Sequence, residues 1–168
     1  RRQRQMCIRD RLVIEPLDDE IVRENGVDLR IGGEAAILLN NPQPIDPERL
    51  SETDLSEYYK VVRVDDSFVV QPYMKVLVAT LEYIRMPADV AALVELRSTL
   101  ARLGLSIPPT IIDAGFEGQV SLESHGGAVP VKLRRGLRFA HAAFFRVEGP
   151  ALPYRGKYQG QRGVTLPR

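Results

Sequence analysis

The stretch "IIDAGFEGQVSLE", from Ile111 to Glu123, places three carboxylates within residues that otherwise form two apolar runs around a turn. The glycines within "AGFEG" permit the backbone conformations that a tight turn requires. The stretch therefore predicts a β-hairpin that has one acid at its entry, Asp113, one at its tip, Glu117, and one at the end of its return strand, Glu123.

The return strand of this hairpin is expected to have one apolar and one polar face. Successive side chains of a strand point to opposite faces, so Val120 and Leu122 share one face while Glu123 lies on the other. The hairpin register would place Glu123 opposite residues 110–111, further from the turn than Asp113. The two acids would then serve different points along one groove.

Each acid also has a purely structural interpretation. An Asp before Ala-Gly often only forms a turn by accepting hydrogen bonds from nearby amides, and for Asp113 in isolation this is the more frequent role. Glu123 alone is equally compatible with a solvated strand residue. Glu117 at the turn is expected to face solvent.

The rest of the chain predicts a mostly β protein. Short runs of β-branched and apolar residues are separated by Gly, Pro, Asn and Asp, which is typical of a sandwich or barrel. The runs lie at residues 27–31, 59–64, 67–72 and 75–86, with two more within 129–148. A Pro-rich acidic segment, residues 41–57, is expected to be a surface loop with at most a helical turn.

One helix is predicted, in "ELRSTLARLGL" at residues 95–105. Leu96, Leu100 and Leu103 recur at helical spacing, and Gly104 offers a stop. The segment contains "RSTLAR", whose arginines and hydroxyls could bind phosphate oxygens through charge-assisted hydrogen bonds. A solvated amphipathic helix has the same pattern, so this signal is weak by itself.

Composition excludes several classes of protein and site. The chain has 168 residues, with 23 Lys and Arg against 22 Asp and Glu, so its net charge gives no reason to expect a nucleic-acid or membrane partner. A single cysteine, Cys7, allows no internal disulfide, and with only His125 and His141 it leaves too few ligands for an ordinary zinc site. No apolar run reaches the roughly 20 residues that span a bilayer. A cytoplasmic protein is expected.

The two ends of the chain have distinct compositions. The opening "RRQRQMCIRDR", residues 1–11, is predicted to be a foreign or disordered leader rather than a nucleic-acid arm, and residues 12–168 a single domain. The tail contains "KYQGQRG", residues 157–163, whose glycines would let the backbone close over a ligand. A frayed terminus is the alternative.

Taken together, "RSTLARLGL", "IIDAGFEGQVSLE" and "KYQGQRG", in this order, resemble the dCTP deaminase branch of the dUTPase-like superfamily, most closely its short archaeal-type members. The resemblance runs from about Leu12 to Pro167 and includes "VRENGVDLRIGG". It implies a homotrimer of distorted β-barrel or jelly-roll subunits with active sites at subunit interfaces. It also implies Mg²⁺ on the nucleotide triphosphate, no zinc and dCTP as substrate, with dUTP and the feedback inhibitor dTTP as further candidate ligands.

The resemblance also assigns roles to individual residues. Glu123 matches the catalytic glutamate, Ser98 and Arg102 lie by the reacting base and its water, and Asp113 matches the acid that binds the deoxyribose 3′-hydroxyl. Phe116 is expected to pack on the sugar and disfavour a 2′-hydroxyl, or to be an ordinary hairpin aromatic. The residues expected to bind substrate are Arg97, Ser98, Thr99, Leu100, Ala101, Arg102, Asp113, Phe116, Ser121, Tyr154, Lys157 and Gln161.

The chemistry of deamination suits these residue types. Replacing the amino group at cytosine C4 requires water to lose a proton on attack, and N3 and the leaving nitrogen to gain one. A single buried carboxyl with a raised pKa can act in turn as base and acid. Arg102 and Ser98 would orient the water and stabilise developing charge.

The match to the family has one departure near the turn. Many bacterial deaminases have "HRID" where this chain has "TIID", so Ile111 replaces their arginine. The same motif resembles that of dUTPases, in which the equivalent of Asp113 activates water to attack the α-phosphate. A dUTP diphosphatase or a bifunctional enzyme is therefore the alternative, although Glu123 argues against a simple dUTPase. A nucleotide-sensing trimer without turnover is a further alternative.

Overall fold

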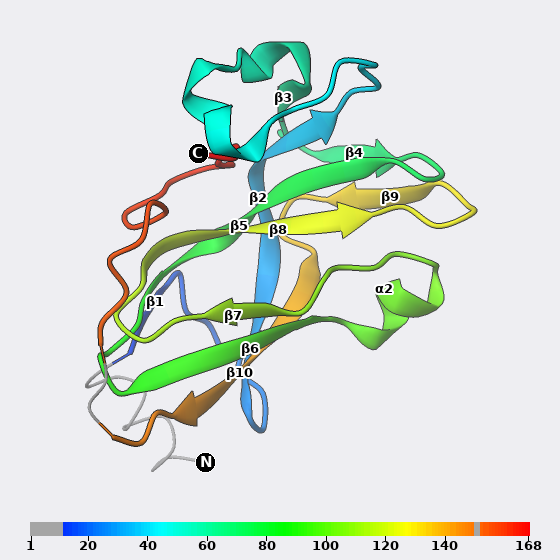
Figure 1. The fold of residues 1–168 in the computed structure, drawn as a ribbon. Helices are drawn as coiled ribbons and strands as arrows, with labels where there is room; N and C mark the ends of the chain where they lie inside the picture. Colours follow the sequence, from blue (N-terminus) through cyan, green and yellow to red (C-terminus); the bar gives the residue numbers. More distant parts are fainter. Residues whose placement is uncertain (1–11, 150–151) are drawn as a thin grey trace.

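The described chain, residues 12–149 and 152–168 of a computed structural model, is made mainly of antiparallel strands that curl into a half-barrel (Figure 1). The strands are β1 (Val13–Glu15), β2 (Gly26–Leu38), β3 (Tyr59–Arg63), β4 (Ser67–Val70), β5 (Lys75–Arg85), β6 (Val90–Leu96), β7 (Thr110–Ile112), β8 (Glu117–His125), β9 (Val131–Arg134) and β10 (Arg138–Arg146). The helical elements are η1 (Pro47–Glu52), η2 (Leu55–Glu57) and α2 (Ser98–Arg102). The predicted mostly β class is confirmed. The predicted leader, residues 1–11, lies outside the described residues.

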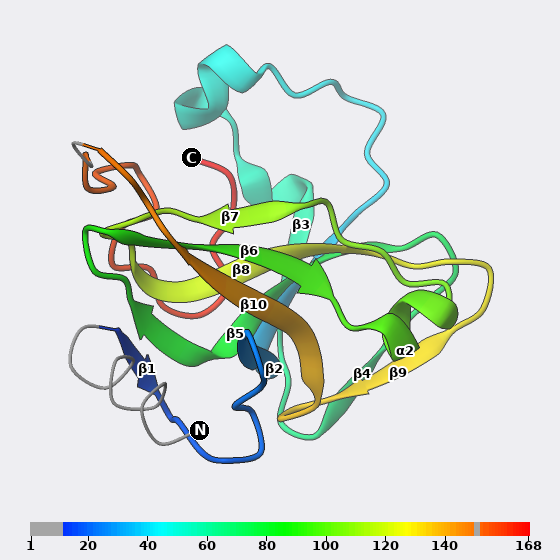
Figure 2. The same ribbon diagram turned by 90° about the horizontal axis from the view of Figure 1, so that it is seen from below.

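Strand β2 joins the two walls of the half-barrel. Its first half pairs with β10, which continues through β6 to β7, and its second half pairs with β5 and β3. Strand β5 also carries β1 and β8, while β4 and β9 form a separate two-stranded ribbon. Seen from below, the wall of β6, β7 and β10 lies across the wall of β5 and β8 (Figure 2). Gly32 allows this arrangement, because a Cβ there would come within 2.7 Å of the Thr80 carbonyl oxygen.

Apolar side chains from both walls fill the space between them. The alternation predicted for residues 27–31 is confirmed, since Val27, Leu29 and Ile31 are all buried. Burial of such side chains is the main favourable term in folding. Other fully buried members of this core include Ile84, Leu122, Leu133 and Phe139. None of the helices in the described part of the chain is long and apolar enough to cross a membrane.

The predicted hairpin of residues 111–123 is wrong in its pairing. Strand β7 pairs with β6, and β8 pairs with β5, so the turn carries the chain from one wall to the other. Gly115 in this turn has a φ of 79°. Both apolar faces become buried this way, with Ile112 facing the core from one wall and Leu122 from the other. The predicted alternation along β8 is confirmed, because Val120 and Leu122 are buried while Glu123 is exposed.

The predicted helix is shorter than its leucine pattern suggested. Residues 95–96 belong to β6, and α2 comprises only Ser98–Arg102. Leu100 is buried and anchors the helix, and Gly104 follows it with a φ of 93°, which favours glycine. The loop at residues 41–57 contains the two short helices η1 and η2, each begun by an Asp side chain that accepts a backbone hydrogen bond.

A buried ion pair connects β2 and β5. The Glu82 carboxylate, which is fully buried, accepts hydrogen bonds from the Arg30 backbone amide at 2.8 Å and from Arg30 Nε at 2.6 Å. Arg30 Nη1 also donates to Asp18 at 2.6 Å. Burial raises the pKa of Glu82, and the hydrogen bonds from Arg30 oppose that shift. Removing Arg30 would leave a buried acid without its countercharge.

We expect Arg30→Met to lower the free energy of unfolding by about 3–5 kcal/mol, because breaking a buried pair leaves one uncompensated charge. Urea denaturation monitored by circular dichroism measures this difference. The matched control is Arg49→Met, which removes an exposed pair with Glu52 and should change stability by about 0.5 kcal/mol or less. Equal unfolding free energies for the two variants would contradict the expectation.

Candidate active site

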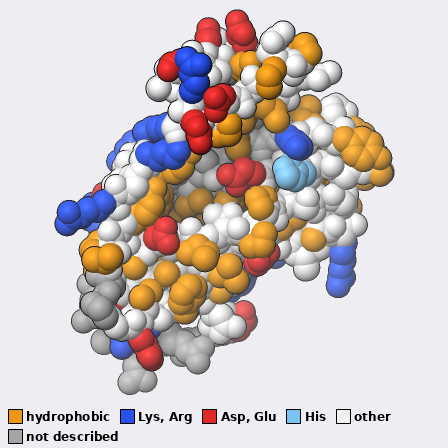
Figure 3. All heavy atoms as spheres, in the orientation of Figure 1, with side chains coloured by type: hydrophobic (Ala, Val, Ile, Leu, Met, Phe, Trp, Pro, Cys, Tyr) orange, Lys and Arg blue, Asp and Glu red, His pale blue; other side chains and the backbone are white. Residues whose placement is uncertain are grey.

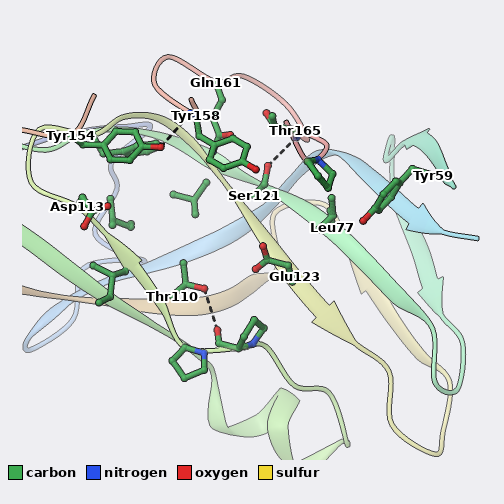
Figure 4. Close-up of a pocket in the computed structure, with 17 residues that line it drawn as sticks. Tyr59, Leu77, Thr110, Asp113, Ser121, Glu123, Tyr154, Tyr158, Gln161 and Thr165 are labelled. Carbon is green, nitrogen blue, oxygen red and sulfur yellow. Dashed lines mark hydrogen bonds between the residues drawn. The ribbon is translucent and has the colours of Figure 1, made fainter. Parts of the chain in front are cut away.

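A pocket of about 590 Å³ opens between the β7 segment, strand β8 and the C-terminal tail (Figure 4). Figure 3 shows the corresponding face, where the surface is hollowed beneath a projecting lobe. One side of the pocket comes from residues 108–113, the floor from β8 and the opposite side from Tyr59 and Leu77. The tail covers part of the opening with Tyr154, Tyr158, Gln161, Thr165 and Pro167.

Asp113 and Glu123, the two acids expected in the site, line this pocket at separate points (Figure 4). Asp113 lies near Tyr154, and Glu123 lies between Thr110 and Leu77. Glu123 is positioned by the register of β8, in which it stands opposite Leu77 of β5. No group in the described residues donates a hydrogen bond to either carboxylate. The turn amides therefore do not hold the Asp113 side chain, and both acids are available to a ligand.

Glu117, predicted to face solvent, is instead half-buried and lies outside the pocket. Its carboxylate accepts hydrogen bonds from Tyr83 Oη at 2.8 Å and from Arg85 Nη2 at 2.9 Å. The hydrogen bond from Arg85, and then that from Tyr83, hold the pKa of the Glu117 carboxyl below its usual range. These partners give Glu117 a structural role at the start of β8.

Aromatic side chains form the end of the pocket near Asp113. Phe116 is buried, and its ring meets the Tyr154 ring edge-on, with centroids 5.7 Å apart and an interplanar angle of 65°. The Tyr154 backbone amide donates to the Ala114 carbonyl at 2.8 Å, which fixes the start of the tail against the turn. Phe116 and Tyr154 therefore lie together, as expected for two residues of one ligand site.

The tail is held against β8 by several hydrogen bonds. Gln161 Nε2 donates to the Gln119 carbonyl at 2.7 Å, and the Thr165 amide donates to Ser121 Oγ at 3.0 Å. The Ser121 hydroxyl proton is free to donate in turn. Ser121 and Gln161, both predicted to bind substrate, thus line the pocket and also fasten the tail.

The remaining predicted residues lie outside this pocket. Six of them belong to α2 and its N-cap: Arg97, Ser98, Thr99, Leu100, Ala101 and Arg102. Leu100 is buried in the core, whereas Ser98, Thr99 and Arg102 are exposed. Lys157 does not line the pocket. Its ammonium donates a hydrogen bond to the Arg168 carbonyl and lies 5.4 Å from the centre of the Tyr158 ring.

Arg97 is oriented by a buried acid that the sequence did not reveal as part of a site. The Asp28 carboxylate is almost fully buried and lies 3.5 Å from Arg97 Nε, 3.0 Å from Arg23 Nε and 3.1 Å from His141 Nδ1. Arg138 Nη1 completes this group at 3.7 Å. The alternation of "VDLRI" placed Asp28 on a polar face but could not show what covers it.

Sequence reasoning missed several pocket residues. Tyr59, Leu77, Thr165 and Pro167 line the pocket but belong to segments that pointed to no chemistry, and Tyr158 lies within the predicted closing tail without having been assigned to the site. Burial, and then the negative charge of Glu123, raise the pKa of the Tyr59 hydroxyl, which places the two groups in one electrostatic environment. The adjacent tyrosines after the Pro-rich loop were the only available signal for Tyr59.

The electrostatic character of the pocket is acidic. Within the described residues its lining contains two carboxylates and no Lys, Arg or His. A nucleotide triphosphate carries several negative charges, so it requires cations that this lining does not supply. The described residues also contain no group of three or more His, Cys, Asp or Glu that could hold a metal ion.

Comparison with known proteins gives a consistent set of relatives. A family model described as dCTP deaminase-like matches residues 1–147. A dCTP deaminase from Sulfurisphaera tokodaii is 51% identical over 156 residues, which cover 92% of this chain and 82% of the relative. A dCTP deaminase from Acidianus ambivalens is 49% identical over 158 residues, covering 94% and 88% of the two chains.

Solved structures match the fold as well. The 2′-deoxycytidine 5′-triphosphate deaminase from Agrobacterium tumefaciens superimposes with a TM-score of 0.67 at 25% identity, over 88% of this chain and 45% of that chain. The present chain therefore spans less than half the length of that protein. A phage phi11 dUTPase matches with a TM-score of 0.54 at 13% identity, over 85% and 95% of the two chains, which shows a shared fold.

Proposed function

The chain belongs to the dCTP deaminase-like family, and from this premise we propose that it is a dCTP deaminase, which hydrolyses dCTP to dUTP and ammonia. The observation that carries the proposal is the position of Glu123, a carboxylate without a hydrogen-bond donor among the described residues, in a pocket walled by Leu77 and the 108–113 segment. The reaction would supply dUTP for pyrimidine deoxynucleotide synthesis. The resemblance also carries the expectations of a cytoplasmic location and feedback inhibition by dTTP.

Glu123 is the proposed acid–base catalyst. Its carboxylate takes a proton from water as the water oxygen bonds to cytosine C4. It passes this proton to N3, then takes the second proton from the new C4 hydroxyl and delivers it to the departing nitrogen. The C4 carbonyl forms as the C4–N bond breaks and ammonia leaves. Such proton shuttling contributes about 10²–10⁴-fold to the rate. Leu77, Pro108 and Pro109 give this part of the pocket an apolar wall.

The sugar and the far end of the substrate have their own proposed contacts. The Asp113 carboxylate accepts a hydrogen bond from the deoxyribose 3′-hydroxyl, which a free acid at this end of the pocket can do. Phe116 packs beside the sugar, where an apolar ring disfavours a 2′-hydroxyl. Ser121, Tyr154 and Gln161 contribute further contacts from β8 and the tail.

The cations for the triphosphate are proposed to come from α2 of a second copy. The pocket lining of one chain carries two acids and no base within the described residues, while Ser98, Thr99 and Arg102 are exposed on α2. In a homotrimer, α2 of each copy would complete the pocket of its neighbour. Ser98 and Arg102 then orient the attacking water, and Arg97, held by Asp28, binds phosphate. Lys157 is the further residue that the resemblance assigns to the triphosphate.

One observation favours a second activity. Asp113 lines the pocket with a carboxylate that the turn amides do not bind, so it could also activate water for attack on the α-phosphate. A dUTP diphosphatase or a bifunctional enzyme giving dUMP is therefore the alternative function.

Product analysis separates these functions. The protein is incubated with Mg²⁺ and either dCTP or dUTP, and both ammonia and pyrophosphate are measured. Ammonia from dCTP without pyrophosphate indicates a deaminase alone, and both products indicate the bifunctional enzyme. Pyrophosphate from dUTP with no deamination of dCTP would overturn the proposal. Binding of nucleotide with neither product would identify a nucleotide-sensing trimer.

We expect removal of Mg²⁺ with EDTA to raise the KM for dCTP by about tenfold or more and leave the folded protein intact. The donor set fits this, because the two carboxylates of the pocket lie at separate points, which suits a metal that the triphosphate itself carries. Mg²⁺ neutralises phosphate charge when bound. Activity assays with added Mg²⁺ or Zn²⁺ check this, and restoration by Zn²⁺ alone would contradict it.

A further inference from the structure

Strand β5 contains a bulge where it pairs with β8. The register runs from the pair Ala79–Ser121 to the pair Tyr83–Gln119, so residues 80–82 of β5 stand opposite a single residue of β8. A bulge of this kind takes main-chain groups out of the ladder, and they must find other partners. Side chains from both strands provide those partners here.

The side-chain amide of Gln119 connects this bulge to the C-terminal tail. Its Nε2 donates to the Thr80 carbonyl at 2.8 Å, within the bulge. Its Oε1 accepts from the Gly163 amide at 2.6 Å, within the tail. One half-buried side chain therefore uses its donor on the rigid sheet and its acceptor on the tail.

The main chain of Gln119 holds the residue that reaches into the pocket. The Gln119 amide donates to the Gln161 carbonyl at 3.0 Å, and Gln161 Nε2 donates to the Gln119 carbonyl at 2.7 Å. Gln161 is buried and lines the pocket, and its Oε1 is buried without a partner in the described residues.

Gly163 is placed so that its amide meets Gln119. Its φ of 65° lies in the left-handed region, and a side chain there would collide with the Glu34 carboxylate. The same carboxylate accepts a hydrogen bond from the Val164 amide at 3.1 Å. These contacts hold the tail against β8, and Gln119 of β8 lies at the centre of the contact.

We propose that Gln119 is a positioning residue, which ties the tail at Gly163 to the β5 bulge and so holds Gln161 in the substrate pocket. This inference rests on the proposed function for the identity of the ligand, dCTP. The attachment of the tail itself does not depend on that identity.

The first test compares Gln119→Leu with the same substitution at Gln71, an exposed residue between β4 and β5. Gln119→Leu should raise the KM for dCTP about tenfold, as expected from the loss of two hydrogen bonds, while kcat changes by less than about threefold. Trypsin cleavage after Lys157 and Arg162 of the nucleotide-free protein should also accelerate about tenfold. Gln71→Leu should match the wild type in both measurements.

A second variant, Gln119→Glu, keeps the size of the side chain and adds a pH readout. Its carboxylate can accept from Gly163 but cannot donate to the Thr80 carbonyl, whereas its protonated form can do both. The ratio of its KM to that of the wild type should therefore fall as the pH decreases from about 8 to about 5, towards the ordinary pKa of Glu.

Two results would overturn the proposal. One is wild-type KM and cleavage rate in both Gln119 variants. The other is a reduced melting temperature and kcat in Gln119→Leu with unchanged KM and no pH dependence in Gln119→Glu, since that pattern indicates a structural role only. If the wild type releases no ammonia from dCTP, the proposed function fails, and the trypsin rates alone decide whether Gln119 holds the tail.

Discussion

Glu123→Gln is expected to lower kcat for deamination of dCTP by about 10²–10⁴-fold, the usual contribution of a general acid–base. Glutamine has the shape of glutamate but cannot accept a proton from water or pass one to the leaving nitrogen. The side chain is exposed in the pocket and no described group donates a hydrogen bond to it, so the substitution leaves the fold undisturbed. Binding of dCTP should therefore persist.

Three measurements define this result. Ammonia release gives kcat, isothermal titration calorimetry with dCTP gives the dissociation constant, and the melting temperature reports on folding. The matched control is Glu117→Gln, which changes the same residue type on the same face of β8 but outside the pocket. Glu117 is bound to Tyr83 and Arg85, so this control should retain turnover. Turnover of Glu123→Gln within about tenfold of the wild type would remove Glu123 from the catalytic role.

The sequence was sufficient for the local structure of this site. Period-two alternation correctly placed Glu123 on the face of β8 opposite Leu122, and the turn residues correctly located the reversal after Asp113. These are properties of adjacent residues, so a pattern within one segment determines them.

Strand pairing could not be obtained in the same way. A short apolar run such as residues 110–112 can pair with any strand that offers an apolar neighbour. In the structure it pairs with β6 and not with β8. The hairpin interpretation failed because it used only local order along the chain. Tyr59 was missed for a related reason, since only the fold brings β3, which pairs with β2, to the pocket that β8 also lines.

Local sequence patterns also could not show where α2 lies relative to the pocket, and this position matters most for function. Ser98 and Arg102 of the motif "RSTLAR" were expected beside the reacting base. None of the described residues that line the pocket comes from α2. If the motif acts in catalysis, the pocket that it serves belongs to another copy of the chain. This interpretation makes a quantitative prediction for mixed assemblies.

Arg102→Ala is expected to lower kcat by about 10²–10³-fold, because it removes a donor that stabilises the charge developing in the transition state. In the proposed homotrimer, assemblies formed from equal amounts of Arg102→Ala and Glu123→Gln should nevertheless recover activity. A site works when its pocket comes from the first variant and its α2 from the second, which holds for about one quarter of the sites in random closed trimers. Mixing the preformed assemblies without subunit exchange should give no recovery.

A second mixture tests the same geometry with a different expected value. The double variant Glu123→Gln, Arg102→Ala is co-assembled with an equal amount of wild-type chain. If each site uses α2 of a neighbour, about one quarter of the sites have both groups, whereas about one half would have both if each chain completed its own site. Steady-state ammonia release per subunit distinguishes these fractions. Half activity in this mixture, together with no recovery in the first, would show that each copy contains its whole site and would exclude the shared site.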